Sequence, residues 1–169
     1  MSVFFLFYEQ IPANYYSEKL RIKLVGPVDF SVRASVEEYG LQSFTEFVEF
    51  VPHEEAVKLQ QQAQINLLVI NNSPNSRTII PGKLYEYLGS GRPILAVGPK
   101  DSDSAKVIDM TQGGVVHEYD DTEGLKSRIL EYFDRYNQGK LSVDAHGTEK
   151  FTRKNLAGEF AKVLDDVMG

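Results

Sequence analysis

The sequence predicts an α/β fold in which helices cover both faces of a parallel sheet. Short apolar runs alternate with amphipathic stretches along almost the whole chain, which is the pattern of a doubly wound sheet. The length of 169 residues and a hydrophobic content of 42% suit a single globular domain, residues 1–169, with a buried core. Glycine and proline residues separate the runs where the chain has to turn. Together these observations predict one layered domain.

Five short apolar runs are the expected strands. The third and fourth are nearly continuous in apolar residues, as strands covered on both faces are, so we expect these two at the centre of the sheet. In chain order the runs are Leu20–Gly26, Phe47–Val51, Ile65–Asn71, Pro93–Gly98 and Val115–Tyr119.

Helices are expected between these strands and at both ends of the chain. Gly40, Gly89 and Gly91 stand where glycine commonly follows a helix. Val3–Ile11 leads into the first strand through a short connection, which favours a helix there and a chain that begins inside a strand-helix unit. The other expected helices are Phe30–Tyr39, His53–Ala63, Gly82–Leu88, Ser102–Thr111, a segment after Thr122 and a last helix from Phe151 to Val167.

Composition excludes several classes of function. A net charge of -6 without a basic stripe argues against nucleic acid, because duplex binding relies on Lys and Arg to neutralise phosphates. There is no cysteine, which removes disulfides, thiolate nucleophiles and Cys-rich zinc sites. The longest apolar run, Val3–Tyr8, is far shorter than the roughly 20 residues of a membrane span. We therefore expect a cytoplasmic protein.

The segment after the third strand has the chemistry of an anion site. In an open α/β sheet, ligands bind beyond the carboxyl ends of the strands. Residues 71–81 form a long loop of turn-forming residues, after which Gly82 opens a helix. Helix-start N–H groups attract anions, Gly82 lets a phosphate approach, and Lys83 adds positive charge. Glu86, three residues further on, can accept hydrogen bonds from ribose hydroxyls.

Two other interpretations of these motifs fit less well. Gly82-Lys83 is not a P-loop, because Arg77 replaces the required upstream glycine and Leu84 stands where Ser or Thr would bind magnesium. The acidic pair around Ser102 could suggest a metal site, but its place between a strand and a helix favours an N-cap. We predict no metal and no cofactor besides a nucleotide-diphosphate sugar as substrate.

The run Pro81–Leu95, which contains the glycine-opened helix, resembles the signature of family 4 glycosyltransferases of the GT-B fold. Leu24–Gly26 and Phe47–Glu55 agree with this family in order and spacing. The similarity covers most of the chain and is nearest to bacterial enzymes that build capsule, lipopolysaccharide or other surface glycans. It implies the Rossmann-like C-terminal half of a two-domain retaining enzyme, with the acceptor and catalytic N-terminal domain outside this chain.

The resemblance also implies roles for individual residues. The glutamate matching Glu86 binds the ribose of a nucleotide sugar in relatives, and backbone N–H groups before Leu84 contact the phosphates. The loop matching residues 51–53 lies against the base. Thr78 replaces a sugar-binding glutamate of many relatives but can still donate one hydrogen bond. No catalytic residue is predicted, and the predicted donor-binding residues are Gly26, Pro52, His53, Asn72, Ser73, Arg77, Thr78, Pro81, Gly82, Lys83, Leu84 and Glu86.

The sheets of these relatives have six strands, and the strand matching the one expected before Val3 lies in the middle. Without it, the strands at Leu20 and Ile65 would face each other as unpaired edges. We expect them either to pair directly or to be bridged by another segment or by a partner chain, which would make a dimer.

The predicted function is donor binding for hexosyl transfer from a UDP or GDP sugar to a glycan or lipid-linked acceptor. The chain alone should bind without catalysing, because such enzymes close two domains over the donor. The full-length enzyme is expected at the inner face of the membrane. A nucleotide-sugar epimerase domain of the same fold also fits the pattern. A receiver or flavodoxin-like signalling module fits less well, since it predicts an acidic cluster where this sequence has Gly26-Pro27, and an Asp where it has Asn71-Asn72.

Overall fold

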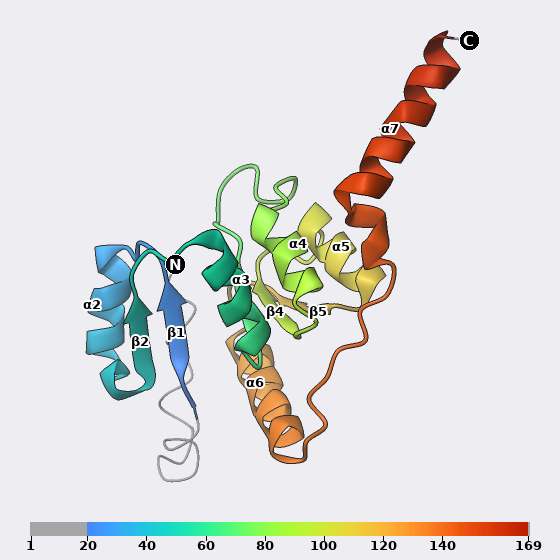
Figure 1. Ribbon diagram of the computed structural model, residues 1–169. Coiled ribbons are helices and arrows are strands. Elements are labelled where there is room, and N and C mark those ends of the chain that lie inside the picture. The colour runs from blue at the N-terminus through green and yellow to red at the C-terminus, as the bar shows by residue number, and fades with distance from the viewer. Residues whose placement is uncertain (1–19, 169) are drawn as a thin grey trace. The chain divides into compact units, whose positions relative to one another are not determined.

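The computed structural model describes residues 20–168 and has the predicted α/β architecture, with parallel strands and flanking helices (Figure 1). The helix predicted at Val3–Ile11 lies outside the described residues. The strands are β1 (Ile22–Val25), β2 (Thr45–Val48), β3 (Asn66–Val69), β4 (Ile94–Val97) and β5 (Gly114–His117). The helices are α2 (Phe30–Glu38), α3 (His53–Gln62), α4 (Gly82–Gly89), α5 (Asp103–Thr111), α6 (Thr122–Asn137) and α7 (Arg153–Met168), with short 3-10 helices η3 (Gln42–Phe44) and η4 (Thr148–Phe151).

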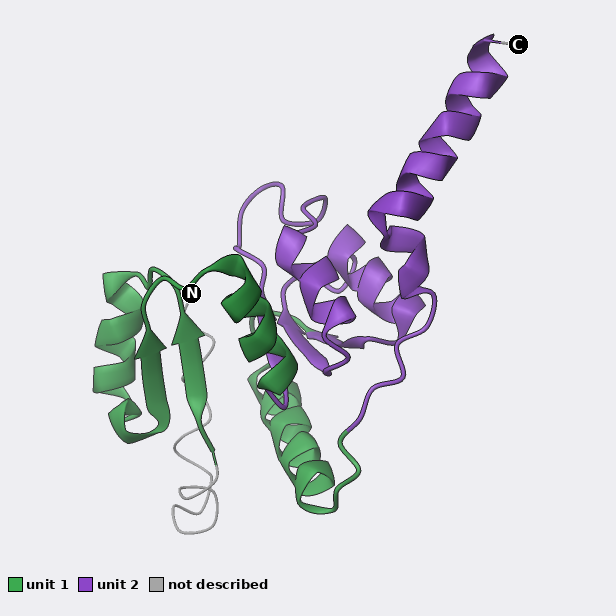
Figure 2. Ribbon diagram, viewed as in Figure 1, with its two compact units in different colours: residues 1–62, 117–141 green, residues 63–116, 142–169 purple. Residues whose placement is uncertain are grey.

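The chain divides into two compact units (Figure 2). Unit 1 comprises residues 1–62 and 117–141, and unit 2 comprises residues 63–116 and 142–169. The organisation of residues 1–169 as one domain stays a prediction.

Unit 1 contains a two-stranded parallel sheet and its own small core. Strand β1 pairs with β2 in a register that runs from Ile22 opposite Thr45 to Val25 opposite Val48. Helix α2 follows β1 and is capped by Asp29, whose carboxylate accepts a hydrogen bond from the Ser31 N–H at 2.8 Å. The core of this unit consists of Val32, Val36 and Leu41, with Leu24, Val28, Phe44 and Phe47 packed against them.

Strand β2 lies earlier in the sequence than predicted. The expected strand Phe47–Val51 is wrong at both ends, since the ladder to β1 covers residues 45–48. Pairing begins directly after the 3-10 turn η3 and ends before Phe50, whose side chain is 83% exposed. The apolar run indicated a strand, but its bounds follow from the pairing with β1.

Unit 2 contains the sheet β3-β4-β5 and the larger core. Strand β4 pairs in parallel with β3, and the Ile94 N–H donates to the Gly113 carbonyl immediately before β5. The four residues of β4 are all buried, as predicted for a central strand. One cluster joins the sheet to helices α4 and α5, and its members are Leu68, Leu84, Leu88, Ile94, Ala96, Val107 and Ile108.

Strand β3 is not central in this sheet. It lies at the edge, beside β4, and its residues alternate between buried and half-buried. The described strands form the sheet β1-β2 in unit 1 and the sheet β3-β4-β5 in unit 2. Direct pairing of the strands at Leu20 and Ile65, which belong to different units, stays a prediction. A bridging segment or partner chain stays a prediction. Among residues 20–168, no helix combines the length and the apolar character needed to cross a bilayer.

Candidate functional site

The start of helix α4 differs from the starts of α2, α5 and α6 in its capping. The N-cap residue is Pro81, which offers no side-chain acceptor, and its carbonyl accepts from the Leu84 N–H at 2.9 Å. By contrast, the N-cap side chains of α2, α5 and α6 each accept a backbone hydrogen bond. An N-terminal turn without a side-chain cap keeps its first N–H groups directed toward whatever lies in front of the helix.

Gly82, the first residue of α4, is exposed, and the space where a side chain would begin is empty. A Cβ added there would meet no atom within 4 Å, and the residue does not have a positive φ. Neither packing nor backbone conformation within the described chain therefore requires glycine at this position. The absence of a side chain leaves space for an external group to approach the backbone.

The side chains of α4 divide between the core and the surface. Leu84 and Leu88 are buried in the unit 2 core, whereas Lys83 is exposed and Glu86 is half-buried. Burial, and secondly the negative charge of Glu86, raise the pKa of Tyr87 above its ordinary value of 10.0. Lys83 and Glu86 are thus three residues apart on the helix, and neither lies in the core. The buried Leu84 and Leu88 anchor the helix to unit 2.

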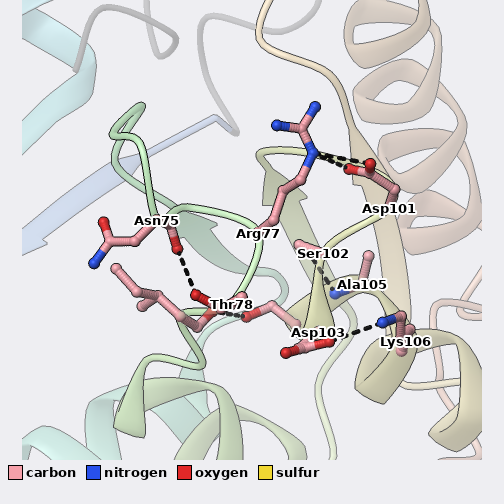
Figure 3. Close-up of polar contacts among 10 residues, drawn as sticks. Asn75, Arg77, Thr78, Asp101, Ser102, Asp103, Ala105 and Lys106 are labelled. Atoms are coloured by element: carbon pink, nitrogen blue, oxygen red, sulfur yellow. Dashed lines mark hydrogen bonds and ion pairs between the residues drawn. The ribbon is translucent and has the colours of Figure 1, made fainter.

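The loop between β3 and α4 is fastened to the start of α5. The Asp103 N–H donates to the carbonyl of Arg77 at 2.8 Å, and the Ser104 hydroxyl donates to the carbonyl of Ile79 at 2.8 Å. Ser102 caps α5 by accepting from the Ala105 N–H at 3.1 Å (Figure 3). Because Ser102 and Ser104 are fully buried, these contacts fix the loop to the α5 end of unit 2.

An ion pair joins the same two segments at the surface. The Nε of Arg77 lies 3.0 and 2.9 Å from the two carboxylate oxygens of Asp101 (Figure 3). Hydrogen bonding from Arg77 lowers the pKa of Asp101 below its ordinary value of 3.8. Both side chains are 66% exposed, so the pair contributes little to stability and can rearrange when another anion competes for the guanidinium.

Polar residues of the loop mainly bind one another. The Ser73 hydroxyl donates to Asn75 Oδ1 at 2.9 Å, and the Thr78 hydroxyl donates to the Asn75 carbonyl at 3.2 Å. The hydrogen bond predicted from Thr78 to a sugar would therefore have to replace this contact within the loop. Asn72 is exposed on the same loop.

Three of the predicted site residues belong to unit 1. Gly26 follows β1 with a φ of +98°, and its N–H donates to the Val48 carbonyl at 3.0 Å. The Pro52 carbonyl accepts hydrogen bonds from two N–H groups in the first turn of α3, and His53 begins that helix with an exposed side chain. The structure thus brings the nine predicted residues between Asn72 and Glu86 into one unit and places these three in the other.

Sequence reasoning assigned the Asp101–Asp103 segment to helix capping, which the structure confirms for Ser102. It missed that Asp101 and Ser104 also hold the loop before α4. The available signal was the position of both residues in the segment that follows β4, whose carboxyl end lies next to that of β3 in a parallel sheet.

No protein-family model matches this sequence, and no curated protein matches it. Among solved structures, the chain is similar to AviGT4, a glycosyltransferase involved in avilamycin A biosynthesis. The identity is 16% and the TM-score 0.47, over 70% of this chain. The chain spans 43% of the length of that enzyme chain.

Proposed function

We propose that this chain binds a nucleotide-diphosphate sugar and serves as the donor domain of a retaining glycosyltransferase. The observation that carries the proposal is the start of α4, which has no side-chain cap and opens with an exposed Gly82 that the chain itself does not require. A diphosphate supplies the negative charge that such a helix start favours. Lys83 adds a cation next to it.

The ribose would follow the diphosphate along α4 toward Glu86. A carboxylate accepts hydrogen bonds from a pair of hydroxyls, and Glu86 lies one turn beyond the proposed diphosphate site. Arg77 would provide a second positive charge if the diphosphate replaced Asp101 as its partner. Under this proposal the nucleotide is of the UDP or GDP type.

Transfer of the sugar would need a second domain that binds a glycan or lipid-linked acceptor. Excluding water and positioning the acceptor depend on closing two domains over the donor. In this proposal the whole enzyme transfers hexosyl groups during surface polysaccharide synthesis, such as capsule or lipopolysaccharide, at the inner face of the membrane. The chain alone binds the donor without turnover.

Nuclear magnetic resonance titration tests the proposal and detects affinities in the millimolar range, equivalent to roughly -4 kcal/mol. We expect UDP, GDP or one of their sugars to shift the amide signals of Gly82, Lys83 and Glu86. Uridine and guanosine, which have no diphosphate, should shift Gly82 and Lys83 much less. Absence of shifts at α4 with every nucleotide, or equal shifts with the nucleosides, would refute the proposal.

A matched pair of variants separates ligand contact from folding. Gly82→Ala and Gly89→Ala each add a methyl group to α4 where no atom lies within 4 Å, so both should fold with unchanged or slightly raised stability. Only Gly82→Ala should weaken donor binding, by about tenfold, because its methyl group occupies the space needed by the phosphate. Equal affinities for both variants would contradict the assigned position of the diphosphate.

A further inference from the structure

Helix α7 presents an apolar face that no described residue covers. All 16 of its residues are exposed, with Phe160 at 64% and Val167 at 80%. Within unit 2 the helix extends away from α4 and α5 (Figure 1). Isolated exposed apolar side chains are common on proteins, but a continuous stripe along one helix indicates an interaction surface. The large apolar residues of this stripe are Leu156, Phe160, Val163, Leu164 and Val167.

The spacing of the stripe suits a second helix. Leu156, Phe160, Val163 and Val167 are separated by four, three and four residues, which places them along one seam of the helix. Leu164 widens the seam on one side. This pattern fits helix against helix packing.

The charges at the two ends of α7 are placed against the helix dipole. Arg153 and Lys154 lie in the first turn, near the positive end, and Asp165 and Asp166 lie in the last turn, near the negative end. The usual stabilising arrangement is the opposite, with acidic residues first and basic residues last. An isolated α7 is therefore electrostatically unfavourable at both ends.

From this charge pattern we infer that α7 pairs antiparallel with α7 of a second copy of this chain. In that arrangement the basic first turn of each copy lies beside the acidic last turn of the other copy. The dimer therefore contains two such contacts between opposite charges. The pairing relieves both unfavourable ends and covers both apolar stripes. Parallel pairing would instead place like charges beside each other at each end.

The charge balance favours this partner over a lipid surface. Helices that lie on anionic membranes are rich in Lys and Arg on their polar face. The ionisable residues of α7 balance, with Arg153, Lys154 and Lys162 against Glu159, Asp165 and Asp166.

The size of the helix limits the strength of the dimer. Sixteen residues form a rod about 24 Å long. Stable interfaces bury roughly 1,200 Å² or more in total, so we expect a pair of rods of this length to form a modest interface. A reversible, concentration-dependent dimer follows.

Charge variants of the full chain test both association and direction. Sedimentation velocity over a wide concentration range should show the dimer in the wild type. Arg153→Glu with Lys154→Glu should raise its dissociation constant at least about tenfold, although the new charges suit the helix dipole. Adding Asp165→Lys and Asp166→Lys to that variant should restore the dimer. Circular dichroism verifies that the helix persists in each variant.

Cross-linking gives an independent readout of direction, because the chain has no native cysteine. A mixture of Leu156→Cys and Leu164→Cys chains should form the mixed disulfide preferentially, since opposite halves of the seam meet in an antiparallel pair. Strong self-linking of each variant alone would indicate parallel pairing and overturn the inference.

Other outcomes also contradict the proposal. A wild-type chain that stays monomeric at every concentration leaves α7 without a second copy as its partner. A monomer that binds vesicles of phosphatidylglycerol and phosphatidylcholine through α7 would identify a membrane surface as the partner instead. Neither result would bear on donor binding at α4.

Discussion

At the scale of residues, two buried serines and one surface ion pair hold the loop before α4. Ser102 and Ser104 are fully buried and use their hydroxyls within unit 2, one as a helix cap and one as a donor to Ile79. Arg77 and Asp101 join the same segments but are largely exposed. The buried contacts therefore fix the position of the loop, whereas the exposed pair leaves the guanidinium able to change partner.

The Arg77 and Asp101 pair predicts a specific acid titration. The pKa of Asp101 should lie below 3.8, and Arg77→Ala should raise it toward that value, because the Arg77 hydrogen bond is the main cause of the lowering. Since the folded pKa is lowered, the stabilising contribution of the pair is present above 3.8 and is lost as the pH falls through the folded pKa. Carboxyl carbon chemical shifts measure this titration. Lys106→Ala is the control and should move the Asp101 pKa less, since Lys106 acts only through weak charge attraction.

At the scale of elements, glycines mark both open and crowded positions. Gly82 and Gly89 in α4 have open space where a side chain would begin, whereas Gly114 at the start of β5 faces the backbone of β4. A Cβ on Gly114 would contact the Ile94 carbonyl oxygen and lie 2.7 Å from its carbonyl carbon. Close packing of two strands explains Gly114 without any reference to a ligand.

Gly114→Ala should therefore destabilise the sheet of unit 2. Relieving the overlap requires β4 and β5 to separate, and overpacking of this kind costs about 1–3 kcal/mol. Urea denaturation followed by circular dichroism measures the loss. Gly89→Ala in the same experiment should be neutral or slightly stabilising, because its methyl group meets no neighbour. A neutral Gly114→Ala would mean that the strands are further apart than described.

At the scale of the whole molecule, residues 20–168 form two hydrophobic clusters, one in each unit. Val32, Val36 and Leu41 form the core of unit 1, and a larger cluster around Leu84 and Ile94 forms that of unit 2. The two clusters have no member in common. Substitutions in different cores should therefore act independently.

Additivity of core substitutions measures that independence. Leu41→Val and Leu84→Val each remove one methylene group and should lower the free energy of unfolding by about 1 kcal/mol. The double variant should equal the sum within about 0.5 kcal/mol. Leu84→Val combined with Leu88→Val, which alters two members of one cluster, should deviate from additivity by more. Strong coupling between Leu41 and Leu84 would instead show that the cores unfold as one.

The sequence by itself determined the fold class, the order of the elements and the starts of the helices at Phe30, His53 and Gly82. The spacing of apolar residues, the apolar runs and the capping residues are local signals. They predicted the start of α4 at Gly82 and the capping role of Ser102. These depend on residues within a few positions of one another.

Only the tertiary structure decided the features that depend on distant partners. It ended β2 at Val48 through its ladder to β1, placed β3 at an edge, and separated the strands into two sheets. It also joined Arg77 to Asp101, which are 24 residues apart in sequence. Strand neighbours and ion pairs of this kind are set by long-range packing and hydrogen bonding, and the local pattern of residues contains no record of which segments meet.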